Sequence, residues 1–211
     1  MNSEYSILKS GTTDIHLLKF EPFDTRNELD KLTSDEIKRL SSFSSASRRM
    51  EFIATRILRH KLFGVEHIHY DAHGAPYILN EGYISVSHTH NYVGIAINKE
   101  YRVGLDLETH RQKILPLLDK FLNESEKKIF DTTSYIEMTK VWSAKEALYK
   151  LAGRKKIIFK SDLLLNNEDG QWKGQIINPN ERIFLDLDIF DSDNTIVSIN
   201  NGPIRIEKYT I

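Results

Sequence analysis

The sequence predicts an α+β protein of two pseudo-symmetric lobes, each an antiparallel sheet packed with helices. Three observations support this fold class. Short apolar segments separated by turn residues predict strands that pair as meanders. Longer segments carry apolar residues at helical spacing. In both halves of the 211-residue chain the predicted helices precede most of the strands, although no sequence repeat relates the halves.

The N-terminal lobe is expected over residues 1–108. Its first strand is predicted at residues 15–20, and apolar spacing predicts a helix over residues 27–40, with Thr33 to Glu36 as a capping region. A second helix, over residues 48–63, is expected to end at Gly64. Strands are then predicted over residues 68–70, 77–79, 83–86, 92–98 and 103–108.

The C-terminal lobe is expected over residues 109–211. Residues 109–115, followed by Pro116, are the predicted connection between the lobes. Helical spacing predicts two helices, over residues 117–130 and 135–152, the second ending near Gly153. Strands are predicted over residues 163–165, 171–177, 183–190, 195–199 and 204–209.

Composition excludes several classes of protein. The net charge of -1 argues against a nucleic-acid binder or a protein of anionic membranes, since both usually carry a basic excess. The absence of cysteine excludes disulfides, thiolate zinc sites and a cysteine nucleophile, and it suits a reducing compartment. No apolar run approaches the length of a membrane span, and the N-terminus does not read as a signal peptide. We therefore expect a cytoplasmic protein with no membrane and no nucleic-acid partner.

The stretch VGLDLE places two acids in an otherwise apolar strand. Residues two apart in a strand share a face, so Leu105 and Leu107 are expected in the core while Asp106 and Glu108 project together from the other side. Mg²⁺ prefers oxygen ligands and often uses one or two carboxylates beside substrate phosphate. The pair alone is weak evidence for a metal site, because an exposed strand end that carries two acids is common.

The segment VWSAKEALYK predicts a helix with a polar face of unusual content. Its apolar stripe leaves Glu146 on the opposite side, with Lys150 one turn ahead and Trp142 one turn back. A surface ion pair between Glu146 and Lys150 is the simplest interpretation. A tryptophan on that face needs cover, however, so the face is expected to adjoin the other lobe or a ligand. The stripe itself consists of Val141, Ala144, Leu148 and Leu151.

Together the two segments resemble the signature pair of the phosphopantetheinyl transferases. ISVSH, with Ser87 and His88, is similar to the Ser-His strand of that family, and residues 48–62 are similar to its arginine-rich helix. The resemblance runs over residues 48–150, and the chain length is similar to the two-lobed type that activates surfactin synthetase. The matching signature positions are Gly104, Asp106, Glu108, Trp142, Lys145, Glu146, Ala147 and Lys150.

The resemblance implies transfer of the 4′-phosphopantetheine arm of coenzyme A to a serine of an apo acyl or peptidyl carrier protein, with release of adenosine 3′,5′-bisphosphate. It implies Mg²⁺, or Mn²⁺ in its place, bound by Asp106, Glu108 and Glu146. The base would be Glu146 or a water beside it, and Lys150 would hold the departing phosphate. By the same resemblance the chain is expected to act as a monomer, with the coenzyme A side on the N-terminal lobe.

Further coenzyme A contacts follow from the resemblance. Ser87 and His88 would contact its phosphates, and Arg49 and Arg56, seven apart on one helix face, would clamp a phosphate. The default interpretation of such arginines is a solvated helix face. A zinc site is the alternative for the histidines, but it leaves the acidic motif unexplained. The histidines in question are His67, His69, His73, His88 and His90.

Two departures from the family pattern leave questions open. Where the family often carries a lysine, the turn here has Ala75, so that Arg49 or His73 replaces that cation or coenzyme A binds more weakly. Residues 153–156 also depart from the usual G-x-G-L, which leaves carrier preference open. Two rival functions remain: a non-catalytic homologue that binds coenzyme A, and a Mg²⁺-dependent diphosphate hydrolase, for which no phosphate-loop motif is present.

Overall fold

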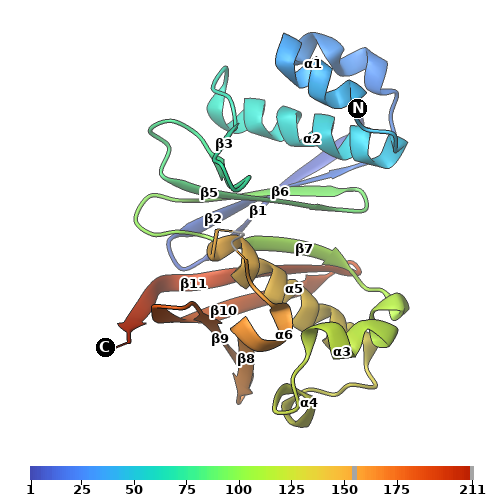
Figure 1. The fold of residues 1–211 in the computed structure, drawn as a ribbon. Helices are drawn as coiled ribbons and strands as arrows, with labels where there is room; N and C mark the ends of the chain where they lie inside the picture. Colours follow the sequence, from blue (N-terminus) through green and yellow to red (C-terminus); the bar gives the residue numbers. More distant parts are fainter. Residues whose placement is uncertain (154–155, 210–211) are drawn as a thin grey trace.

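The computed structural model describes residues 1–153 and 156–209 and confirms the α+β fold of two antiparallel sheets packed with helices. One sheet has four strands in the order β1-β2-β6-β5, and the other has five in the order β7-β11-β10-β9-β8. Figure 1 shows α2 over the four-stranded sheet and α5 against the five-stranded sheet. None of the helices in these residues is both long and apolar enough to cross a membrane.

The N-terminal lobe is held together by α2 on its sheet. Ala54 and Leu58 of this helix pack against Val93 and Ile95 of β6, and all four are almost fully buried. The helix ends at Gly64, whose φ of 59° lies in the left-handed region that glycine tolerates. The elements of this lobe are β1 (Ser3–Ser10), β2 (Thr13–Phe20), η1 (Thr25–Lys31), α1 (Ser34–Ser41), α2 (Ala46–Phe63), β3 (His69–Tyr70), β4 (Pro76–Tyr77), β5 (Tyr83–Thr89) and β6 (Tyr92–Asn98).

The helix predicted over residues 27–40 is two helices, so this prediction was wrong in extent. A capping box starts the second of them: Thr33 Oγ1 accepts from the Glu36 amide, and Glu36 Oε2 accepts from the Thr33 amide. The capping residues were recognised in the sequence, but their consequence is a break rather than a continuous helix. Strand β1 was missed as well, because most of its residues are exposed and polar.

The C-terminal lobe wraps short helices and α5 around the five-stranded sheet. The helix predicted over residues 117–130 is broken at Leu122, which is extended, and Asn123 Oδ1 then accepts from the Ser125 and Glu126 amides. The elements are β7 (Leu105–Thr109), η2 (Gln112–Leu117), α3 (Leu118–Phe121), α4 (Glu126–Ile129), α5 (Tyr135–Leu151), α6 (Phe159–Asp162), β8 (Leu163–Glu168), β9 (Gln171–Ile177), β10 (Glu181–Ser192) and β11 (Thr195–Lys208).

The last two strands form a long hairpin. Asp193 and Asn194 turn the chain with φ values of 50° and 62°, a conformation that Asn and Asp tolerate better than most residues. The separate strands predicted over residues 195–199 and 204–209 are one continuous strand, β11. Its first part pairs with β7, which places β7 in the C-terminal sheet.

The two lobes share a core at β7. Leu105 and Leu107 are 0% and 1% exposed and pack with Ile15 and Leu17 of β2, which confirms their predicted burial. The division of the chain between residues 108 and 109 stays a prediction. By hydrogen bonding, the strand that carries Asp106 and Glu108 belongs to the C-terminal sheet while its side chains also meet the N-terminal lobe.

Gly104 explains how closely α5 approaches β7. A Cβ atom at this position would lie 2.2 Å from the carbonyl oxygen of Ala147 and 2.9 Å from Cβ of Leu151. The backbone carbonyl cannot rotate away as a side chain can, so only glycine allows this approach. The end of α5 is thereby fixed directly beside the acidic strand.

We therefore expect Gly104→Ala to move α5 and to lower the free energy of unfolding by about 1–3 kcal/mol, the usual cost of overpacking. Urea denaturation monitored by circular dichroism measures this change. Gly174→Ala is the matched control, because its Cβ would meet a methyl group of Leu148 at 2.7 Å and that side chain can adjust. Equal destabilisation by the two variants would contradict the role given to Gly104.

Candidate active site

Lys150, in the last turn of α5, links the two lobes at the centre of the site. Its ammonium donates to Ser87 Oγ at 2.8 Å, to the Leu105 carbonyl oxygen at 2.8 Å and to Asp106 Oδ1 at 2.9 Å. These acceptors come from β5 and β7, so one cation joins a helix and a strand of the C-terminal lobe to a strand of the N-terminal lobe. The structure thus brings together Lys150, Ser87 and Asp106, three of the residues predicted from the sequence.

Asp106 has one satisfied and one unsatisfied carboxylate oxygen. Its Oδ1 accepts from Lys150 and, at 3.1 Å, from Ser87 Oγ. Its Oδ2 is buried and has no hydrogen-bond partner in the structure. A buried acceptor without a partner is costly, and such atoms usually serve a ligand or another function. The unpartnered oxygen therefore marks a position where a cation would be favoured.

Glu108 lies on the same strand face as Asp106, as predicted from their spacing. Its Oε1 accepts from Trp142 Nε1 at 2.9 Å and lies 3.4 Å from Nη2 of Arg111. Burial raises the pKa of the Glu108 carboxyl, and the nearby negative charge of Asp106 raises it further. A half-buried carboxyl whose pKa is raised by burial and by a neighbouring carboxylate is typical of functional sites.

Trp142 is covered by its own lobe rather than left on a polar surface. Its ring stacks on Phe159 with a centroid distance of 5.4 Å, meets Phe121 edge-on at 5.3 Å, and lies 5.7 Å from the guanidinium of Arg111. With these contacts the indole can aim its N–H at Glu108. The aromatic residue that stood out in the sequence is therefore a support for the second carboxylate.

Glu146 lies between Trp142 and Lys150 on α5 and is half-buried. Across residues 1–153 and 156–209, the structure contains no ready-made cluster of three metal-ligating side chains. The metal ligand set Asp106, Glu108 and Glu146 therefore stays a prediction.

Lys145, another signature residue, is fully buried away from this site. Its ammonium lies 2.8 Å from Glu126 Oε2 and donates to the carbonyl oxygens of Phe121 at 2.6 Å and Phe159 at 3.1 Å. Glu126 Oε1 also accepts from the Leu165 amide. Burial lowers the pKa of Lys145, and Glu126 acts in the opposite direction. Lys145 thus anchors the short helices α3, α4 and α6 to α5. The sequence did not predict that Glu126 is its partner.

The arginine beside His88 is Arg48. It hydrogen-bonds the His88 ring, and both side chains contact Glu51, at 3.1 Å from Arg48 and 3.3 Å from His88. Arg49, which was predicted with Arg56 to clamp a phosphate, donates to the carbonyl oxygen of Phe43 at 2.7 Å, and its phosphate contact stays a prediction.

Arg56 is in a buried ion pair. Its Nε donates to Glu36 Oε1 at 3.0 Å, and its side chain is 4% exposed. The guanidinium also lies 4.0 Å from the centre of the Phe52 ring. These contacts join α1 to α2, and the phosphate contact predicted for Arg56 stays a prediction.

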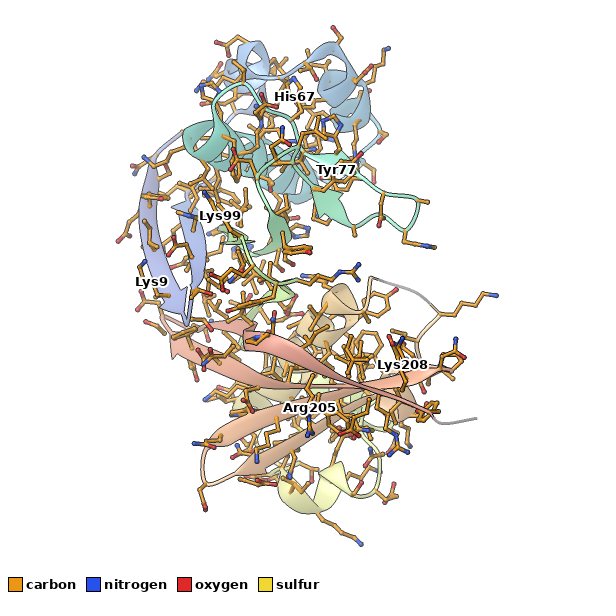
Figure 2. All side chains as sticks on the ribbon, turned by 90° about the vertical axis from the view of Figure 1, so that its left-hand side faces the viewer. Lys9, His67, Tyr77, Lys99, Arg205 and Lys208 are labelled. Carbon is orange, nitrogen blue, oxygen red and sulfur yellow. The ribbon has the colours of Figure 1, made fainter. Side chains whose placement is uncertain are left out.

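Two hollows meet at Pro76 of β4. One, of about 350 Å³, lies between the lobes and is lined by Ala75, Arg102 and Lys150, among others. The other, of about 220 Å³, lies on the N-terminal lobe and is basic and aromatic. Figure 2 labels Tyr77, an exposed residue that lines the first hollow, on the N-terminal lobe. The second hollow includes Arg39, Phe43, Arg48, Phe52, Arg56 and His88.

Residues 102–196 match the sequence model of the 4′-phosphopantetheinyl transferase superfamily. The matched segment contains both signature stretches, and it leaves Ser87, His88 and the arginines of α2 outside. A search of the curated proteins finds no match to the chain. The departure predicted over residues 153–156 includes Arg154 and Lys155, which lie outside the described residues.

Proposed function

We propose that the chain is a Mg²⁺-dependent phosphopantetheinyl transferase of the two-lobed type. It would move the 4′-phosphopantetheine arm of coenzyme A to a serine of an apo acyl or peptidyl carrier protein and release adenosine 3′,5′-bisphosphate. The observation that carries this proposal is the cross-lobe contact of Lys150 with Ser87 and Asp106, beside an Asp106 oxygen without a partner. The superfamily match over residues 102–196 supports the same reaction class.

The residues present fit a hard divalent cation. Asp106 Oδ2 is buried and unpartnered, Glu108 lies on the same face, and Glu146 follows on α5. Carboxylate oxygens are the ligands that Mg²⁺ prefers, with phosphate and water completing its shell. Bound there, the ion would neutralise charge on the coenzyme A diphosphate and orient the leaving group.

The chain's own side chains would supply the remaining steps. Glu146 would accept the hydroxyl proton of the carrier serine while the oxygen of that serine attacks the phosphorus next to pantetheine. The bond from that phosphorus to the bridging oxygen breaks, and the bridging oxygen leaves with the adenosine bisphosphate. Lys150 would hold positive charge beside the departing phosphate while it keeps Asp106 oriented.

Coenzyme A would occupy the two hollows that meet at Pro76. Arg48 and His88 would face phosphate in the basic hollow. In the other hollow, Arg102 would take the role of the lysine expected at the position of Ala75, because both line the same space. The Arg102 guanidinium has no carboxylate partner among the described residues, so its charge is available to a ligand.

We also propose that the protein works as a monomer in the cytoplasm. The absence of cysteine suits that compartment, and the site uses residues of one chain only.

The transfer reaction is tested by incubating the protein with coenzyme A, Mg²⁺ and several apo carrier proteins and measuring the intact mass of each carrier. We expect the gain of one phosphopantetheine, lost in EDTA. Asp106→Ala and Glu146→Gln should each lower the rate at least about 100-fold, the usual scale for a catalytic group. Glu124→Gln, at an exposed carboxylate, is the control and should match the wild type.

Unchanged transfer by Asp106→Ala or Glu146→Gln would overturn the site assignment. Coenzyme A binding without transfer to any carrier would favour the non-catalytic homologue. Cleavage of coenzyme A without a carrier would favour the hydrolase.

Arg102→Ala should weaken coenzyme A binding about tenfold, since a charge-assisted hydrogen bond to phosphate contributes about 1.5–3 kcal/mol. Isothermal titration calorimetry measures the dissociation constant. Ala75→Lys in the Arg102→Ala background should restore much of the affinity, because it returns a cation to the same hollow. Arg205→Ala, at an exposed arginine of β11 labelled in Figure 2, is the control. Equal affinity of Arg102→Ala and wild type would remove Arg102 from the binding site.

A further inference from the structure

The two sheets meet along β5 and β7 without a backbone ladder. Strand β5 is the last strand of the four-stranded sheet, and β7 is the first strand of the five-stranded sheet. On its other side β7 pairs with β11 in an antiparallel register, with Asp106 opposite Ser198. The polar backbone groups on the open side of β7 must therefore find partners that are not another strand's backbone.

Two serines of β5 supply these partners. Ser85 Oγ accepts from the Leu105 amide at 2.9 Å, and Ser87 Oγ accepts from the Leu107 amide at 3.0 Å. The serines are two residues apart on β5, as the leucines are on β7, so the two contacts follow the repeat of extended chain. The carbonyl oxygen of Leu105 also has a side-chain partner, because it accepts from the ammonium of Lys150.

Both contacts are buried. Ser85 and Ser87 are each 4% exposed, and Leu105 and Leu107 are nearly inaccessible. Without the hydroxyls, the two amides would be left unsatisfied inside the interface between the lobes, and each would cost about 1–3 kcal/mol. The interface therefore strongly favours the alignment in which Ser85 accepts from the Leu105 amide and Ser87 accepts from the Leu107 amide.

This alignment also determines the chemistry of the site. A slip of β5 by one two-residue step would move Ser87 about 7 Å along β7. Ser87 would then lose Asp106 and Lys150, which it contacts at 3.1 Å and 2.8 Å. The same slip would displace His88, the next residue of β5, relative to the carboxylates of β7.

We propose that Ser85 and Ser87 form a register lock between the lobes, and that Ser85 is a positioning residue of the transferase. Ser85 lines neither of the two hollows, so it acts through the alignment of β5 with β7 rather than through contact with substrate. This inference rests on the proposed function for its catalytic part. The lock itself is a property of the protein without any substrate.

Ser85→Ala tests both parts. In amide hydrogen exchange followed by NMR, the Leu105 amide should exchange at least about tenfold faster, because it loses its acceptor. In the transfer assay kcat should fall about 10- to 100-fold, since a misplacement near 1 Å has effects of that size, while KM for coenzyme A changes less. If this variant does not fold, Ser85→Cys, which keeps the volume and leaves only a weak acceptor, takes its place with the same expectations.

Thr13→Val is the matched control. It removes a buried hydroxyl of the N-terminal lobe that accepts from Asn98 Nδ2 at 3.0 Å, and it leaves the contact between β5 and β7 intact. It should lower stability without changing kcat or the exchange of the Leu105 amide.

An unchanged exchange rate at Leu105 in the Ser85 variant would overturn the register lock. A loss of kcat no larger than in Thr13→Val would overturn the positioning role. If the wild type transfers to no carrier, the proposed function and the positioning role fail together, and the exchange of Leu105 still decides whether the lock exists.

Discussion

The arrangement of the site depends on the ammonium of Lys150. It has three donors, and Ser87, Leu105 and Asp106 accept all three from two strands that belong to different lobes. A half-buried ammonium is stable only when its hydrogen bonds are satisfied, so the alignment of the lobes and the charge of the site are coupled. The carboxylate oxygen that Lys150 does not reach, Oδ2 of Asp106, is the one left for a cation.

The signature residues divide into two groups by what they touch. Gly104 and Lys145 are structural: the first admits the carbonyl of Ala147 beside β7, and the second is paired with Glu126 inside the C-terminal lobe. Asp106 and Lys150 lie where the lobes meet and carry the chemistry proposed for the site. The structural group holds α5 close enough to β7 for the chemical group to make contact.

Local pattern predicted much of this arrangement. Alternation along a strand was enough to place Leu105 in the core and Asp106 with Glu108 on the other face. It was not enough for partners that are distant in the sequence. The role of Ser85 depends on a strand 20 residues away, and the burial of Glu126 depends on Lys145, so neither is visible in local periodicity. The superfamily match supports the reaction class, whereas the lobe that carries His88 lies outside the matched segment.

In the proposed site, Asp106 would hold a divalent cation over the diphosphate of coenzyme A. Electron paramagnetic resonance of Mn²⁺, titrated into the protein with coenzyme A present, tests it directly because the free ion's signal decreases on binding. We expect one bound ion per chain in the wild type and its loss in Asp106→Asn. Equal Mn²⁺ binding by Asp106→Asn and the wild type would contradict it.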